Sequence, residues 1–308
     1  MSVFRMLFVC VFFAPAFAQT APTLSGDFRN WLNANGYAAY DFARDDLDGG
    51  SFGGKTTAGQ AVNRRPVIFV HGNGDRAWGR TFGQTGWRAS RDAFLAAGYS
   101  EAELYATTWG PANPALASLQ YHSYSYLDRT RAFIEAVLAY TGASQVDVIT
   151  HSMGVTLARK AIKGGGGNDS ADGGTYNLGS PLTARINTFI GIAGANHGLA
   201  SCYFTGPSTP TCGATNGFYP GYMAGVWGPY SVSRFLTDLN RTTGFEGAKV
   251  YTIWSTVDEI VGFGGLVYGR YTARINGQDG ETVYSETPYG HFNCKDLTTS
   301  VQLDRLGY

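Results

Sequence analysis

The alternation of short apolar runs with helix-length segments constrains the fold of this chain more than any other feature. The runs are rich in β-branched and aromatic residues, and they lie at residues 67–70, 104–107, 146–149, 186–192 and 250–254. Strands buried on both faces of a parallel sheet have this composition. The spacing therefore predicts an α/β architecture with a mostly parallel central sheet and crossover helices on both faces.

Two of the intervening segments have the periodicity of helices. In residues 124–140, apolar side chains recur at helical spacing and Gly142 supplies a stop signal. A second helix is predicted directly after Ser152, ending at the glycine run 164–167. That run and the polar residues up to Gly179 suggest an exposed loop. Residues 19–62 show little periodicity and predict an irregular lead before the sheet.

The first residues have the pattern of an export signal. Arg5 precedes an apolar run at 6–13, and Ala16-Phe17-Ala18 is a small-x-small cleavage site. The run is shorter than the ~20 residues that cross a bilayer, and no later stretch approaches that length. We therefore predict a signal peptide at 1–18, a single secreted domain at 19–308 and no transmembrane anchor.

The charge balance argues against nucleic acid as a partner. The chain has 23 Lys and Arg against 23 Asp and Glu, so no net field attracts a polyanion. A neutral, small-molecule partner is favoured, with no cofactor.

Secretion changes the interpretation of the cysteines. Cys10 leaves with the signal peptide, whereas Cys202 and Cys212 flank a short stretch of Gly, Pro, Ser and Thr. A disulfide between them would close a small loop at low entropic cost. Cys294 is then a free, packed thiol, and no Cys/His spacing resembles a metal site.

Residues 150–154, Thr-His-Ser-Met-Gly, have the pattern of a nucleophile elbow in which Thr150 replaces the usual first glycine. The pattern lies between a predicted strand and a predicted helix, which is the context that the motif requires. Ser152 is therefore the predicted nucleophile, and Gly154 leaves room where the strand and helix approach each other.

A second loop, residues 71–75 (His-Gly-Asn-Gly-Asp), follows the first buried strand. Its backbone N–H groups could face a developing oxyanion, with Asn73 and Met153 as the two predicted donors. A plain glycine-rich turn between strand and helix is one alternative. A phosphate-binding loop is another, but no Gly-Lys-Ser/Thr follows.

A serine nucleophile needs a base, and the base needs a carboxylate that orients it. In the α/β-hydrolase order of Ser, acid and His, the base comes last, which selects His291. Asp258 is the preferred acid because it follows the run at 250–254, and Glu259 is its close rival. The predicted triad is Ser152, Asp258 and His291.

The other histidines are assigned different roles. His71 belongs to the oxyanion loop, and His151 should point away from the nucleophile beside it. His122 is interpreted as a hydrogen-bonded loop residue. His197 competes with His291 but is ranked as a residue lining the substrate site.

Residues 66–75 and 144–154 resemble the class 2 lipase family. Together with 202–206 and 212–213, they also resemble a lipase-like extracellular polyhydroxyalkanoate depolymerase. The resemblance implies an α/β-hydrolase fold, the same triad, and Asn73 with Met153 at the oxyanion. Relatives with Ala in place of Thr150 make that departure compatible with activity.

Residues 201–235 form an aromatic-rich insertion that we predict to be a cap facing the substrate. Its alternative is a small satellite core under a long loop. The candidates for lining the substrate site are His197, Tyr203, Phe204, Tyr222 and Trp227.

The sequence thus predicts a secreted serine carboxylic-ester hydrolase, in the first place a lipase that acts on a small-molecule or lipid ester at an oil–water interface. A polyhydroxyalkanoate depolymerase or a short-chain esterase would use the same acyl-enzyme chemistry. An inactive hydrolase fold that binds an apolar ligand is the alternative of another class.

Overall fold

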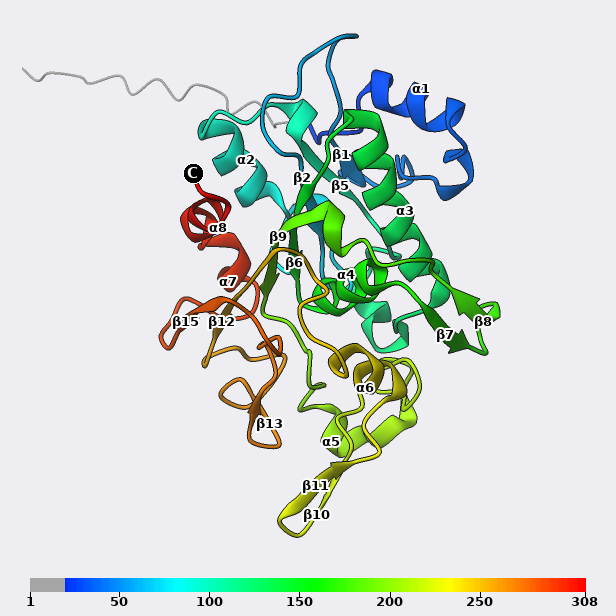
Figure 1. Ribbon diagram of the computed structural model, residues 1–308. Helices are drawn as coiled ribbons and strands as arrows, with labels where there is room; N and C mark the ends of the chain where they lie inside the picture. Colours follow the sequence, from blue (N-terminus) through cyan, green and yellow to red (C-terminus); the bar gives the residue numbers. More distant parts are fainter. Residues whose placement is uncertain (1–19) are drawn as a thin grey trace, which may run out of the picture.

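A computed structural model describes residues 20–308, and the predicted export signal at 1–18 lies outside them. Within the described chain, a seven-stranded sheet has the order β1-β5-β2-β6-β9-β12-β15 (Figure 1). Only β1 is antiparallel to its neighbour. The strands are β1 (Ser51–Phe52), β2 (Val67–Val70), β5 (Leu104–Thr107), β6 (Val146–His151), β9 (Ile186–Ile192), β12 (Lys249–Ser255) and β15 (Gly280–Tyr284). The five predicted strands and the α/β-hydrolase architecture are confirmed.

Alternate side chains of the strands enter two different cores. In β2, Ile68 and Val70 belong to one buried cluster, while Val67 and Phe69 belong to another. Successive side chains of a strand point to opposite faces, so both faces of the sheet are covered. This explains why β2 is a continuous apolar run without alternating polar residues.

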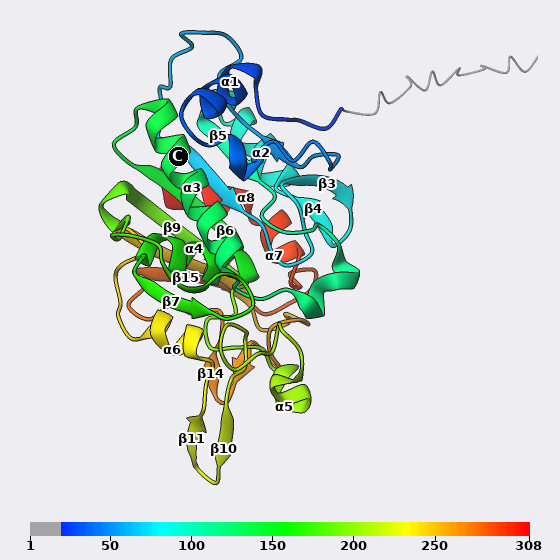
Figure 2. The same cartoon turned by 90° about the vertical axis from the view of Figure 1, so that its right-hand side faces the viewer.

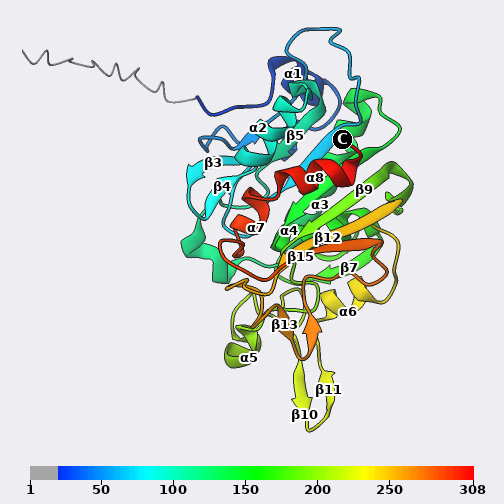
Figure 3. The same cartoon turned by 90° about the vertical axis from the view of Figure 1, so that its left-hand side faces the viewer.

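Helices cover both faces. Figures 1 and 3 show α1 and α3 on one side of the sheet and α2, α7 and α8 on the other. The helices are α1 (Gly26–Ala34), α2 (Arg88–Ala96), α3 (Tyr124–Thr141), α4 (Met153–Lys163), α5 (Cys202–Thr205), α6 (Arg234–Asn240), α7 (Asn293–Asp296) and α8 (Thr299–Leu306). The two predicted helices, α3 and α4, are confirmed, and α3 ends at Gly142, whose φ is 70°.

Two sequence-based expectations are wrong. The lead before the sheet is not irregular throughout, because Ser25 caps α1 by accepting from the Phe28 N–H. Phe28 and Leu32, one turn apart, are buried in the core. The expected exposed loop after α4 contains a hairpin of β7 (Gly166–Asp169) and β8 (Gly174–Asn177).

The insertion at 201–235 contains α5 and a hairpin of β10 (Tyr222–Ala224) and β11 (Trp227–Tyr230) before α6 begins. Figures 1, 2 and 3 agree that this hairpin projects from the body, on the same end as α5. The predicted Cys202–Cys212 disulfide is present, and Cys294 is a buried free thiol.

The remaining two-stranded ladders are β3 (Trp78–Thr81) with β4 (Gln84–Gly86), and β13 (Leu266–Val267) with β14 (Arg270–Tyr271). None of the helices in residues 20–308 combines the length and apolarity needed to cross a bilayer.

Candidate active site

Ser152 sits in the sharp turn between β6 and α4, with φ 54° and ψ −126°. A non-glycine residue with positive φ is strained, and such strain is typical of a serine held at an elbow. A Cβ on Gly154 would lie 2.4 Å from the His71 carbonyl oxygen and 2.5 Å from that of Val70. The elbow therefore requires glycine at this position. The Thr150 side chain is accommodated, because its hydroxyl donates to the Ile190 carbonyl at 2.9 Å.

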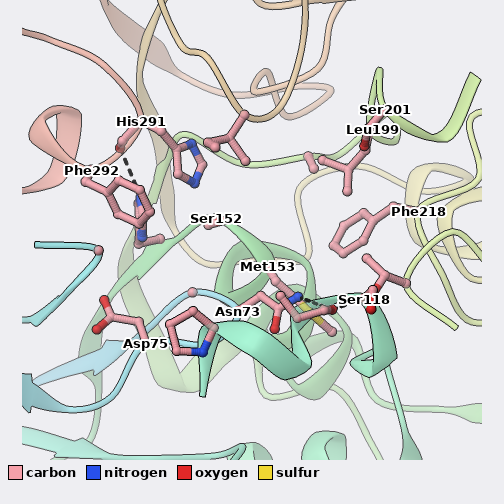
Figure 4. Close-up of a pocket in the computed structure, with 18 of the residues that line it drawn as sticks. Asn73, Asp75, Ser118, Ser152, Met153, Leu199, Ser201, Phe218, His291 and Phe292 are labelled. Atoms are coloured by element: carbon pink, nitrogen blue, oxygen red, sulfur yellow. Dashed lines mark hydrogen bonds between the residues drawn. The ribbon is translucent and has the colours of Figure 1, made fainter. Parts of the chain in front are cut away.

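Ser152 opens into a cavity of about 490 Å³ that also receives Asn73, Met153 and His291. Figure 4 shows the His291 ring directed toward Ser152, with Asn73 and Met153 below it. The structure thus brings together the predicted nucleophile, base and oxyanion loop. No hydrogen bond joins Ser152 Oγ to His291 within the described chain, and such bonds often close only when substrate binds.

Asp258 is the carboxylate that faces the base. It follows β12, and its Oδ2 lies 2.8 Å from His291 Nδ1 in a buried pair. Its other oxygen accepts from the N–H groups of Ile260 and Val261. Burial raises the pKa of Asp258, but the His291 partner and these N–H groups outweigh it and hold that pKa below its ordinary value. The acid therefore stays ionised beside the imidazole.

The backbone of His291 is held from two further sides. Its N–H donates to Glu259 Oε2 at 2.9 Å, and its carbonyl lies 3.1 Å from His151 Nε2. Glu259, the rival acid, thus contacts the main chain of the base and Asp258 contacts its ring. A carbonyl can only accept, so His151 carries its proton on Nε2. Burial lowers the pKa of His151 well below its usual value and keeps that ring neutral.

The expected orientation of His151 is wrong. The His151 side chain lies against His291, with ring centroids 4.7 Å apart, and it lines the cavity. The end of β6 places His151 between the nucleophile and the loop of the base. Its short distance to the His291 carbonyl explains why it does not turn away.

The oxyanion loop is fixed by its own polar groups. The Asn73 side chain donates to the Ala117 carbonyl at 2.9 Å. Asp75 accepts from the Arg76 and Gly86 N–H groups and lies 3.3 Å from Lys295 Nζ. Within residues 20–308, the backbone N–H groups of Asn73 and Met153 have no acceptor. Two such donors beside a serine can bind an oxyanion, and the Met153 N–H also lies at the positive end of α4.

The five predicted substrate-lining residues do not line this cavity. His197 lies in a separate hollow with Arg241 and Arg270. The Tyr203 hydroxyl accepts from the Tyr268 N–H, and the two rings pack at a tilt of 50°. Phe204, Tyr222 and Trp227 are exposed on the insertion. The prediction fails because these three aromatic side chains of the insertion are exposed and Tyr203 packs against Tyr268, whereas Phe218 is the aromatic side chain of the insertion that lines the cavity.

Other residues form the apolar walls. Phe82 from the β3–β4 turn and Phe292 beside the base pack with ring centroids 5.4 Å apart. Phe218 and Leu199 (Figure 4), together with Ile260, complete the wall. The position of Phe292 next to His291 was the one available sequence signal, whereas Phe82 is brought in by a turn far from any motif.

The remaining histidines and the free thiol are engaged elsewhere. His122 contacts the Asn216 carbonyl and the Thr156 hydroxyl, as predicted, and His71 contacts the Gly72 carbonyl. Burial lowers the pKa of His71 to about 4 and that of His122 to about 3. Burial also raises the pKa of the Cys294 thiol, so it is not a thiolate nucleophile.

The chain is similar to proteins of known structure and to one family model. Among solved structures, Aspergillus fumigatus lipase B matches with 17% identity and a TM-score of 0.52, covering 87% of this chain and 58% of that one. Bacillus licheniformis lipase BlEst2 matches with 16% identity and a TM-score of 0.48, covering 83% of this chain and 97% of that one. The search of curated proteins finds no match. The family model described as "Lipase (class 2)" matches residues 64–304. The chain therefore belongs to the class 2 lipase family.

Proposed function

We propose that this protein is a secreted serine carboxylic-ester hydrolase, a lipase, that works through an acyl-enzyme on Ser152. The observation that carries the proposal is the convergence of Ser152, the His291–Asp258 pair and two unbound N–H groups on one cavity. Each is a different component of acyl transfer, and together they match the roles that the chemistry requires.

In the proposed mechanism, Ser152 Oγ attacks the ester carbonyl carbon as His291 Nε2 takes the hydroxyl proton. Asp258 holds Nδ1 and stabilises the imidazolium. The N–H groups of Asn73 and Met153 bind the oxyanion. Collapse of the intermediate expels the alcohol, which receives the proton from His291. Water then attacks the acyl-enzyme with the same base, releasing the acid and the free serine.

The cavity supports a neutral, apolar ester as substrate. Its walls include Phe82, Phe218 and Phe292, and the one carboxylate among its lining residues, Asp75, is already bound by N–H groups and Lys295. An apolar wall with few polar groups suits an acyl chain. The Cys202–Cys212 disulfide supports an oxidising, extracellular location.

The test is hydrolysis of p-nitrophenyl esters from acetate to palmitate, with Ser152→Ala and His291→Ala as matched variants. The native protein should be active and both variants should lose about a thousandfold or more. A fluorophosphonate probe should label the native protein and not Ser152→Ala. A folded native protein that neither hydrolyses an ester nor reacts with the probe would reject the enzyme and favour the apolar-ligand binder.

A further inference from the structure

Four of the five most exposed large apolar side chains of the described chain lie on the insertion and a neighbouring loop. On the β10–β11 hairpin, Val226 is 86% exposed and Trp227 is 71% exposed. Phe204 on α5 and Phe263 are 81% and 67% exposed. Single exposed apolar residues are common on protein surfaces, but a group of this kind marks an interaction site.

These segments carry no charge. Residues 198–233 contain no Asp, Glu, Lys, Arg or His, and neither do residues 260–269. The two segments form one surface, because the Tyr268 hydroxyl donates to the Gly221 carbonyl at 2.9 Å and the Tyr268 N–H donates to the Tyr203 hydroxyl. A surface without charges complements an uncharged partner and offers nothing to anionic headgroups.

This uncharged surface is continuous with the mouth of the cavity. Ile260 begins the second segment, lines the cavity and is 47% exposed. Thr205 lines the cavity beside the exposed Phe204 on α5. Phe82 lies across the cavity as a further exposed apolar side chain. A partner that rested on the surface would therefore lie over Ser152.

The hairpin has a gradient of polarity along its length. Val226 and Trp227 lie at its tip, whereas Tyr222 and Tyr230 pair across its stem with ring centroids 5.8 Å apart. The figures show that the tip is the part farthest from the body. An apolar tip with tyrosines behind it suits a fluid interface, in which the tip enters the apolar phase and the hydroxyls stay near water. A rigid flat surface could not be entered by the hairpin and would contact only its tip.

We propose that the β10–β11 hairpin inserts into the surface of a neutral lipid phase, such as triacylglycerol, and holds the cavity of Ser152 against it. The biological role of this adsorption rests on the proposed lipase function, but the adsorption itself does not require catalysis. Burial of Val226 and Trp227 supplies the adhesion, because removing large apolar side chains from water is favourable.

The test separates adsorption from catalysis. Proteins in a Ser152→Ala background are mixed with a triolein emulsion stabilised by gum arabic, and the fraction that floats with the lipid is measured. The double variant Val226→Ser/Trp227→Ser should partition at least about tenfold less. Leu297→Ser, which removes a half-exposed leucine at the end of α7, should not change the partition. Equal flotation of the hairpin variant and its parent would overturn the proposal.

Further experiments identify which partner binds the surface. With Ser152 intact, the hairpin variant should hydrolyse dissolved p-nitrophenyl butyrate within about twofold of the native rate and triolein at about one tenth of it. Loss of binding to polyhydroxybutyrate granules with unchanged triolein flotation would assign the surface to a solid polyester instead. A dimer by gel filtration that the variant breaks, again with unchanged flotation, would assign it to a second copy. Failure of the native protein on every ester would reject the proposed function, while flotation would still decide adsorption.

Discussion

The two sides of the cavity are built in opposite ways. On the side of the sheet, charged and polar groups hold the site: Asp258 and Glu259 contact His291, and Lys295 contacts Asp75. On the side of the insertion, the contacts are a disulfide, neutral hydrogen bonds and ring packing. In the proposed mechanism, the groups that transfer the proton are thus held by directional bonds, whereas the surface proposed for an apolar partner is built without charge.

The largest expected effect lies within the polar side. Asp258→Asn should lower kcat by about a thousandfold to ten-thousandfold, because an amide neither stabilises the imidazolium nor fixes its tautomer. Glu259→Gln should cost less than about tenfold, because its amide oxygen still accepts from the His291 N–H. Rates on p-nitrophenyl butyrate across pH 5–9 check both variants. Equal losses in the two would show that neighbouring carboxylates do not have separate roles.

Gly154→Ala should cost about 2–4 kcal/mol of stability, because the added Cβ would meet the backbone oxygens of Val70 and His71. Gly26→Ala is the matched control, since nothing lies within 4 Å of a Cβ there and its φ is not positive. Urea unfolding measures both. A Gly154→Ala protein as stable as the control would contradict the close approach of the elbow to the loop at His71.

On the insertion side, Cys202→Ser/Cys212→Ser should lower the free energy of unfolding by about 2–3 kcal/mol, through the entropy gained by the unfolded chain. Hydrolysis of a short dissolved ester should stay within about threefold, because the triad lies outside the insertion. Dithiothreitol should destabilise the native protein and leave the variant unchanged. A large loss of activity on the dissolved ester would show that the insertion shapes the catalytic groups.

The smallest effect concerns pH. Burial holds the pKa of folded His122 at about 3, against 6.5 for an ordinary histidine. Between these values the unfolded chain binds more protons, so stability is full above pH 6.5 and falls as the pH drops. At pH 5, the titration of His122 lowers the free energy of unfolding by on the order of 1–2 kcal/mol.

His122→Gln keeps a hydrogen-bonding side chain and removes this titration, so its stability should depend less steeply on pH. Urea unfolding at pH 7.5, 6 and 5 measures the slope. His122 joins Asn216 of the insertion to Thr156 of α4 and stacks on Phe235 at 3.8 Å. Identical slopes in the native protein and the variant would exclude His122 from the acid sensitivity of the insertion.

The sheet was predictable from sequence because each buried strand is a local pattern. The runs at β2, β5, β6, β9 and β12 are mostly buried, and polar residues such as Asp147 in β6 interrupt them at only a few positions. The edge strand β15 was missed because its residues are only partly buried and include Glu281. At the N-terminal side, α1 was missed because Phe28 and Leu32 gave too few periodic positions.

The candidate site was likewise predictable only in part. Ser152 could be placed because its motif lies between a strand and a helix, and His291 because chain order selects it. The separate roles of Asp258 and Glu259 could not be predicted, since they depend on which carboxylate faces the ring and which faces the backbone. The cavity walls were predicted wrongly, because an aromatic composition does not tell whether Trp227 or Phe218 points inward.

The contact between Asp75 and Lys295 joins parts of the chain that are 220 residues apart. During synthesis, the oxyanion loop and the serine elbow emerge long before the loop of the base and α7. A nascent chain that already carries Ser152 therefore lacks His291, the proton acceptor of the proposed mechanism, and it also lacks Phe292, which forms part of the cavity wall. In the proposed mechanism, hydrolytic activity therefore arises only in the finished fold, and an incomplete chain would not hydrolyse esters inside the cell that makes it.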